Sequence, residues 1–182
     1  MGLDMYLSKK TYVKQWSHNK PEEQFEVNVT KGGEPFNEIQ PSRVSYVTEE
    51  LMYWRKANQI HGWFTHNGRE IAEEVSYSLS FEDLQNLLDI CKQVLDVLNK
   101  SEKGVVQVVG GWKEGKEYMV DVEVYDCEDE VMALLPPTEG FFYGNYEIGE
   151  YYKETIEETV RFLESELPKC NEYDEFEYYA SW

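Results

Sequence analysis

The chain has 182 residues, of which 41% are apolar and 27 are aromatic (14 Tyr, 8 Phe and 5 Trp). This composition needs a buried core, so it excludes an intrinsically disordered chain, and the length suits one domain. The 36 acidic residues outnumber the 17 basic ones and give a formal net charge of −19. Such a charge argues against direct binding to nucleic-acid phosphates and against an anionic membrane surface.

The first third of the chain predicts two strands and a helix. Loose alternation of apolar and polar residues predicts a strand over Leu3–Val13, and cleaner alternation predicts another over Gln24–Thr30. Thr48 is a good helix N-cap and is followed by two glutamates that favour a first helical turn. We therefore expect a helix from Thr48 that ends near Asn67-Gly68.

The rest of the chain predicts two further helices, a hairpin and a terminal strand. Ser80 begins a Ser-x-x-Asp capping signature ahead of a long apolar stripe. Two β-rich runs, Val105–Val109 and Tyr118–Tyr125, flank a glycine-containing turn and predict a hairpin. A helix is expected over Glu150–Leu167, and the aromatic tail Glu175–Trp182 is expected to add a strand.

These elements do not alternate regularly between strand and helix. The order therefore predicts an α+β fold rather than a doubly wound parallel sheet. We expect a single domain over residues 1–182, in which about three helices pack on a mainly antiparallel sheet.

The acidic residues are concentrated in the later part of the chain. Residues 1–69 contain nine basic and eight acidic residues, a net charge of +1, whereas residues 70–182 contain eight and 28, a net charge of −20. A cationic pocket is therefore expected only in the first third. The acidic part is either a solvated surface or an interface for a basic partner.

Cysteines and histidines give no metal-site or disulfide pattern. No cysteine lies in a C-x-x-C motif, and the histidines lack the spacing of a zinc site. We expect no metal and no cofactor. The first residues, MGLDMYLSKK, contain no basic segment ahead of an apolar one, so we expect a cytoplasmic protein without a secretory signal. The residues considered are Cys91, Cys127, Cys170, His18, His61 and His66.

The predicted helix after Thr48 carries the candidate ligand site. On a helical wheel, Trp54, Asn58 and His61 form a stripe beside a core seam of Tyr53, Ala57, Ile60 and Phe64. A half-buried Asn or His needs a partner, because an unmatched buried polar group costs about 1–3 kcal/mol. In a ligand-binding interpretation, Trp54 stacks on a planar group that Asn58 and His61 hydrogen-bond. Arg55 or Lys56 then binds an anionic group. In the alternative, Asn58 and His61 pair with a neighbouring backbone segment and the two bases are solvated.

An aromatic loop, Gly140–Tyr146, precedes the last predicted helix. A loop at a helix N-terminus can present backbone N–H groups to an anion. Phe142 and Tyr143 are therefore candidates to close the same cleft from the opposite side. The alternative is a hydrophobic loop that packs on the core.

Three segments carry a resemblance to a known family. They are MGLDMYL (residues 1–7), YWRKANQIHGWF (residues 53–64) and LPPTEGFFYG (residues 135–144). In them the chain resembles an uncharacterised family of small proteins found in bacteria and in phage or prophage genomes. The resemblance implies a shared fold and an intracellular setting, the host cytoplasm for a phage protein, but no activity. The chain departs from the family in residues 67–78, where relatives carry an acidic stretch with cysteine, and in the hairpin at 105–125.

Three hypotheses about function remain. The first is a binding protein for a small anionic, nucleotide-like molecule, which in a phage setting would sequester a host signal. The second is an acidic protein-interaction module, or DNA mimic, that inhibits a host protein. The third is a hydrolase or transferase that uses His61. Because none of the common catalytic motifs occurs, we assign no catalytic residue.

Overall fold

A four-stranded antiparallel sheet lies at the centre of the protein. The computed structural model describes residues 2–66, 74–140 and 142–182. The strand order is β4-β1-β8-β5, and every neighbouring pair is antiparallel. The bounds are β1 (Asp4–Tyr12), β4 (Tyr46–Arg55), β5 (Glu74–Leu79) and β8 (Glu175–Ser181).

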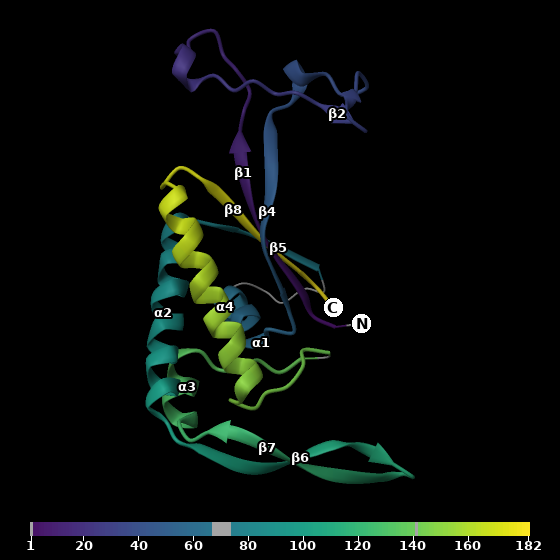
Figure 1. The fold of residues 1–182 in the computed structure, drawn as a ribbon, viewed down its shortest axis with the longest axis vertical. Coiled ribbons are helices and arrows are strands. Elements are labelled where there is room, and N and C mark those ends of the chain that lie inside the picture. The colour runs from purple at the N-terminus through teal and green to yellow at the C-terminus, as the bar shows by residue number, and fades with distance from the viewer. Residues whose placement is uncertain (1, 67–73, 141) are drawn as a thin grey trace.

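Helices cover one face of this sheet and leave the other face open (Figure 1). The long helices α2 (Phe81–Lys100) and α4 (Glu150–Glu166) pack against each other, and the shorter helices are α1 (Asn58–His66) and α3 (Glu128–Leu134). The core lies between the two layers and contains the inward side chains of β1 together with the apolar stripes of the helices. The predicted α+β fold, with helices on an antiparallel sheet, is confirmed.

Local sequence signals account for most of these elements. Ser80 caps α2 as predicted: its Oγ accepts a hydrogen bond from the N–H of Asp83, and the Asp83 carboxylate accepts one from the N–H of Ser80. The helix α4, the terminal strand β8 and the hairpin of β6 (Lys103–Lys113) and β7 (Lys116–Tyr125) are also confirmed.

The predicted helix from Thr48 is wrong in its first half. Tyr46–Arg55 is the strand β4, and the helix begins only at Asn58. Nine residue pairs join β4 to β1, and the pairing shifts between Leu7 and Ser8, where Leu51 is the extra residue on β4. This bulge interrupts the two-residue alternation that would have indicated a strand. The capping signal at Thr48 is therefore overridden by sheet pairing.

Other predicted elements differ from the observed ones in their bounds, and some observed elements were not predicted. Of the strand predicted over Gln24–Thr30, only Thr30 belongs to a strand, in the short pair β2 (Thr30–Lys31) and β3 (Glu34–Pro35). The elements α3 and β5 were not predicted. The predicted helix end at Asn67-Gly68 and the aromatic residue Phe141 lie outside the described residues.

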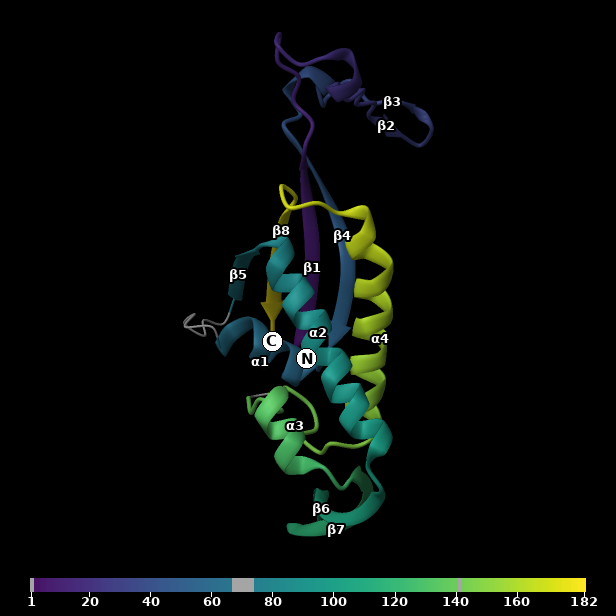
Figure 2. The same cartoon turned by 90° about the vertical axis from the view of Figure 1, so that its left-hand side faces the viewer.

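Two extensions project from opposite ends of the protein (Figures 1 and 2). At one end the chain between β1 and β4, residues 13–45, forms an irregular arm with β2 and β3 and the short 3-10 turns Pro21–Glu23 and Pro41–Arg43. The other extension is the β6–β7 hairpin. Within the described residues, no helix combines the length and the apolar character needed to span a membrane.

Candidate functional site

His61 lies on α1 in the core, with both ring nitrogens bonded to tyrosines. Its Nδ1 is 2.7 Å from the Oη of Tyr178 on β8, and its Nε2 is 3.1 Å from the Oη of Tyr143. A neutral imidazole has one donor and one acceptor nitrogen, so one tyrosine accepts from the ring and the other donates to it. Burial raises the pKa of both tyrosines, well above 10 for Tyr178, so both phenols stay protonated at neutral pH.

Asn58 fixes the segment between α3 and α4. Its Nδ2 donates to the carbonyl of Asn145 at 2.7 Å and to that of Tyr143 at 3.3 Å, while its Oδ1 accepts from the N–H of Thr138 at 3.1 Å. The buried polar groups of Asn58 and His61 thus have protein partners. Asn58 pairs with backbone groups of a neighbouring segment, as in the alternative interpretation, whereas His61 pairs with side-chain hydroxyls.

Trp54 and Arg55 point to opposite sides of β4. Trp54 is buried, and its Nε1 donates to the Oγ1 of Thr159 on α4 at 2.9 Å. Arg55 is exposed, with its Nε 4.0 Å from the carboxylate of Asp4. The prediction that Trp54 shares one helix face with Asn58 and His61 is therefore wrong, because Trp54 belongs to the strand.

Two further residues of the predicted site also differ from expectation. Tyr53, predicted in the core seam, is exposed on the outer face of the sheet and donates a hydrogen bond to Asp4. Phe142 has an exposed side chain, and its carbonyl accepts from the N–H of Leu3 at 3.3 Å. Phe142 therefore contributes a backbone contact that attaches its loop to the start of the chain.

Lys56 forms the joint between β4 and α1. It has a left-handed backbone with φ of 55°, held by a hydrogen bond of 2.7 Å from its N–H to the carbonyl of Leu3. Its side-chain stem runs between two glycines: a Cβ at Gly144 would lie 3.0 Å from the Lys56 Cβ, and a Cβ at Gly2 would lie 3.2 Å from its Cε. The two glycines therefore leave room for the lysine.

Lys56 also lines a pocket of about 370 Å³ at the start of α4. This volume falls within the usual range of small-molecule sites. We call it the α4 pocket. Its walls come from α1, β7 and the residues on either side of the α4 N-terminus: Lys56, Gln59, Asp121, Val122, Glu123, Asn145, Glu147, Gly149, Glu150, Tyr151 and Tyr152.

The first turn of α4 borders this pocket. Gly149 is the N-cap and offers no side-chain cap, and the first intrahelical bond runs from the N–H of Lys153 to the Gly149 carbonyl at 3.1 Å. The three preceding N–H groups therefore have no partner inside the helix. A helix N-terminus also carries a partial positive charge that favours an oxygen anion or a carbonyl.

Gln59 gives a second, independent indication of a ligand. It is 3% exposed, and its Nε2 is buried without a hydrogen-bond partner among the described residues. Thr138 Oγ1 shares this property. A buried amide donor that lacks a partner costs about 1–3 kcal/mol. Since Gln59 lines the α4 pocket, a turn of its side-chain amide would bring the Nε2 to an acceptor bound there.

Four of the residues that line the pocket are acidic: Asp121, Glu123, Glu147 and Glu150. Glu150 accepts a hydrogen bond from Lys103 at 2.9 Å and one from Tyr125 at 3.2 Å, and these bonds hold its pKa below the usual range. Asp121 accepts a hydrogen bond from Gln107 at 3.0 Å. The pocket thus combines donors with an acidic rim, which disfavours a multiply charged anion.

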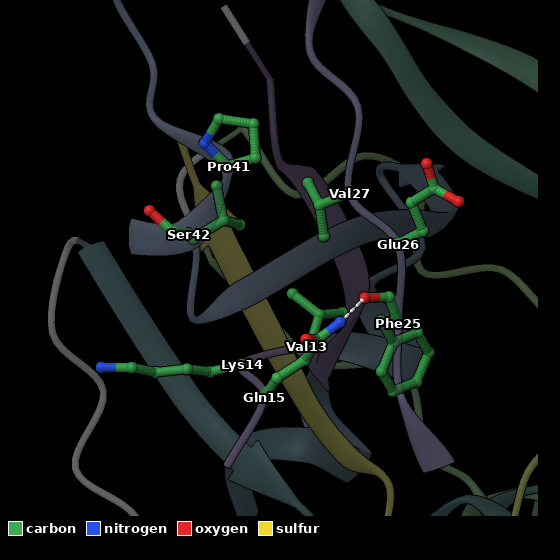
Figure 3. Close-up of a pocket in the computed structure, with 9 residues that line it drawn as sticks. Val13, Lys14, Gln15, Phe25, Glu26, Val27, Pro41 and Ser42 are labelled. Atoms are coloured by element: carbon green, nitrogen blue, oxygen red, sulfur yellow. Dashed lines mark hydrogen bonds between the residues drawn. The ribbon is translucent and has the colours of Figure 1, made fainter. Parts of the chain in front are cut away.

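The arm contains another opening, of about 420 Å³ (Figure 3). Val13, Phe25 and Val27 supply apolar walls, and the side-chain amide of Gln15 donates to the carbonyl of Phe25. Its lining includes neither of the two buried side-chain atoms that lack a partner within the described part of the chain. The arm opening is therefore a weaker candidate than the α4 pocket.

The chain was also compared with known proteins. No family model, curated protein or solved structure matches it. The functional argument therefore depends on the geometry of the site.

Of the seven residues predicted to bind a ligand, Lys56 alone lines the α4 pocket. Asn58 contributes indirectly, because it holds the pocket residue Asn145. Gln59 was missed. Gln59 lies between Asn58 and Ile60, and all three side chains are buried. The sequence shows a polar residue at this position, but its burial can be inferred only once α1 is known to begin at Asn58.

Proposed function

We propose that the protein binds a small polar molecule in the α4 pocket. The observation that carries the proposal concerns Gln59, a residue that lines the pocket and whose buried Nε2 has no hydrogen-bond partner among the described residues. The ligand presents an oxygen acceptor to Gln59 and to the N–H groups of the α4 first turn. The ammonium group of Lys56 favours a carboxylate in this position.

The acidic rim narrows the class of ligand. Asp121, Glu123 and Glu147 repel a polyphosphate, which disfavours the nucleotide expected from the sequence. The same carboxylates attract an amino group. A zwitterion with a carboxylate at one end and an ammonium at the other, such as a free amino acid, matches both parts of the pocket.

A thermal-shift screen tests this proposal. The panel consists of the free L-amino acids, short dicarboxylates and mononucleotides. A ligand at 100 times its Kd stabilises a protein by about 2.7 kcal/mol, which is readily detected as a rise in Tm. We expect such a rise with at least one amino acid and none with mononucleotides. No stabilisation by any member of the panel would contradict the proposal.

The variant Gln59→Met gives a sharper test because it separates folding from binding. Removing the unpartnered amide is expected to raise the free energy of unfolding by about 1–3 kcal/mol without ligand, while abolishing stabilisation by the amino acid identified in the screen. Urea unfolding measures both effects. Gln93→Met, at an exposed position on α2, is the matched control and should change neither. A less stable Gln59→Met protein would show that the amide has a structural role.

A further inference from the structure

The β6–β7 hairpin has an open edge along β6. In the described part of the chain β6 pairs with β7 alone, in a two-stranded sheet. The edge of β7 that faces away from β6 makes a backbone hydrogen bond at its C-terminal end, where the N–H of Tyr125 donates to the carbonyl of Ile148 at 2.8 Å. An isolated two-stranded ribbon is marginally stable in water, and an open strand edge is a template for pairing with another strand.

The side chains of this hairpin are unusually apolar for an exposed element. Val105 is 64% exposed, Trp112 is 70% exposed and Met119 is 51% exposed. Residues 104–112 of β6 contain no charged residue. Natural edge strands usually carry charges or proline that block pairing, and this edge has neither over that stretch.

The sequence of β6 is symmetric. Residues 104–110 are Gly-Val-Val-Gln-Val-Val-Gly, a palindrome centred on Gln107. A two-fold axis through Gln107 sets Val105 of one copy opposite Val109 of another, and Val106 opposite Val108, on both sides of the axis. An interface with two-fold symmetry requires this kind of self-complementarity. The bulge between Val109 and Gly111 marks the end of the regular edge.

Charge favours contact at this end of the protein. Residues 103–125 contain three basic and four acidic residues, a net charge of −1, and the remaining residues have a net charge of −18. The hairpins lie at one extremity (Figure 1) and carry little net charge, so two copies that meet through them keep their more acidic parts apart.

We propose that two copies of the chain pair antiparallel through β6 about a two-fold axis at Gln107. The two hairpins then form one four-stranded sheet. Pairing uses both open β6 edges. The other edge of each hairpin is β7, which carries the charged residues Lys116, Glu117, Asp121 and Glu123, and such charges block further strand pairing, so the assembly closes at a dimer. The contact is a strand edge, smaller than the roughly 1,600 Å² of a standard interface, and we expect a dimer with a Kd in the micromolar range.

Sedimentation between about 1 and 200 μM protein tests the pairing directly. The wild-type chain should pass from monomer to dimer. Gln107→Lys places two ammonium groups opposite each other at the axis and should raise the Kd at least tenfold. Gln93→Lys, on the exposed face of α2, makes the same change in net charge and should leave the Kd unchanged.

Mixing two variants tests the position of the axis. Gln107→Lys and Gln107→Glu should each be weak dimers alone, and an equimolar mixture should recover dimer, because opposite charges then face each other. Recovery also demonstrates that both variants are folded. A wild-type chain that stays monomeric, growth beyond a dimer, a Kd unaffected by Gln107→Lys or a mixture that does not recover would each overturn the proposal.

Discussion

Replacing His61 with alanine is expected to lower the free energy of unfolding by about 3–5 kcal/mol. The change removes a side chain that is 0% exposed and takes hydrogen-bond partners from Tyr143 and Tyr178. Each phenol left unpaired in the core costs about 1–3 kcal/mol, and the cavity adds to that loss. The contact between the His61 and Trp182 rings, 5.3 Å apart, is lost as well.

Urea unfolding followed by circular dichroism measures this effect. Arg55→Ala is the control from the same segment, since its side chain is exposed and its nearest carboxylate is 4.0 Å away. It should change the free energy of unfolding by less than about 0.5 kcal/mol. A loss below about 1 kcal/mol for His61→Ala would contradict the structural role that we assign to the histidine.

Replacing Asn58 with alanine is expected to lower the free energy of unfolding by about 2–4 kcal/mol. It breaks three hydrogen bonds and leaves the N–H of Thr138 and the carbonyls of Tyr143 and Asn145 without their partner. The loss should be concentrated at Thr138, Tyr143 and Asn145. Because Asn145 lines the α4 pocket, binding of the amino acid found in the screen should weaken too.

Hydrogen exchange separates this local effect from global unfolding. Relative to the wild type, Asn58→Ala should accelerate exchange at the amide of Thr138 more than at the amides in the middle of α2, because α2 has its own cap at Ser80. Asn28→Ala removes a similar amide in the arm and is the control, since its side chain is exposed and donates a long hydrogen bond of 3.3 Å to Glu26. Uniform acceleration at both places would show that Asn58 stabilises the whole core rather than this segment.

Elements with local signals were predictable from the sequence. The helix α2 has a capping box and an apolar stripe, and α4 has its own stripe, so each is specified within its own residues. The strand β4 depends instead on its pairing with β1, a partner about forty residues away, and its bulge hides the alternation. The short helix α3 has three acidic residues in its first turn but no side-chain N-cap bond, and its seven residues are too few to show an apolar stripe.

The candidate site was less predictable for a related reason. Asn58 meets Tyr143 and Asn145 across more than eighty residues of sequence, and Lys56 meets Gly2 and Gly144. Helical spacing relates residues only within one element, so it could not bring these segments together. The sequence indicated which residue types needed partners, whereas the fold decides which partners they find.

The glycine turn at the end of the arm offers a position for a label. Gly32 and Gly33 both have positive φ and connect the paired residues Lys31 and Glu34, and a Cβ at either glycine would meet nothing within 4 Å. A peptide inserted there lengthens a closed loop, which costs little conformational entropy. The arm and the β6–β7 hairpin lie at opposite ends of the protein, so a tag in this turn would immobilise the chain on a sensor surface with the hairpin directed toward solution (Figure 1).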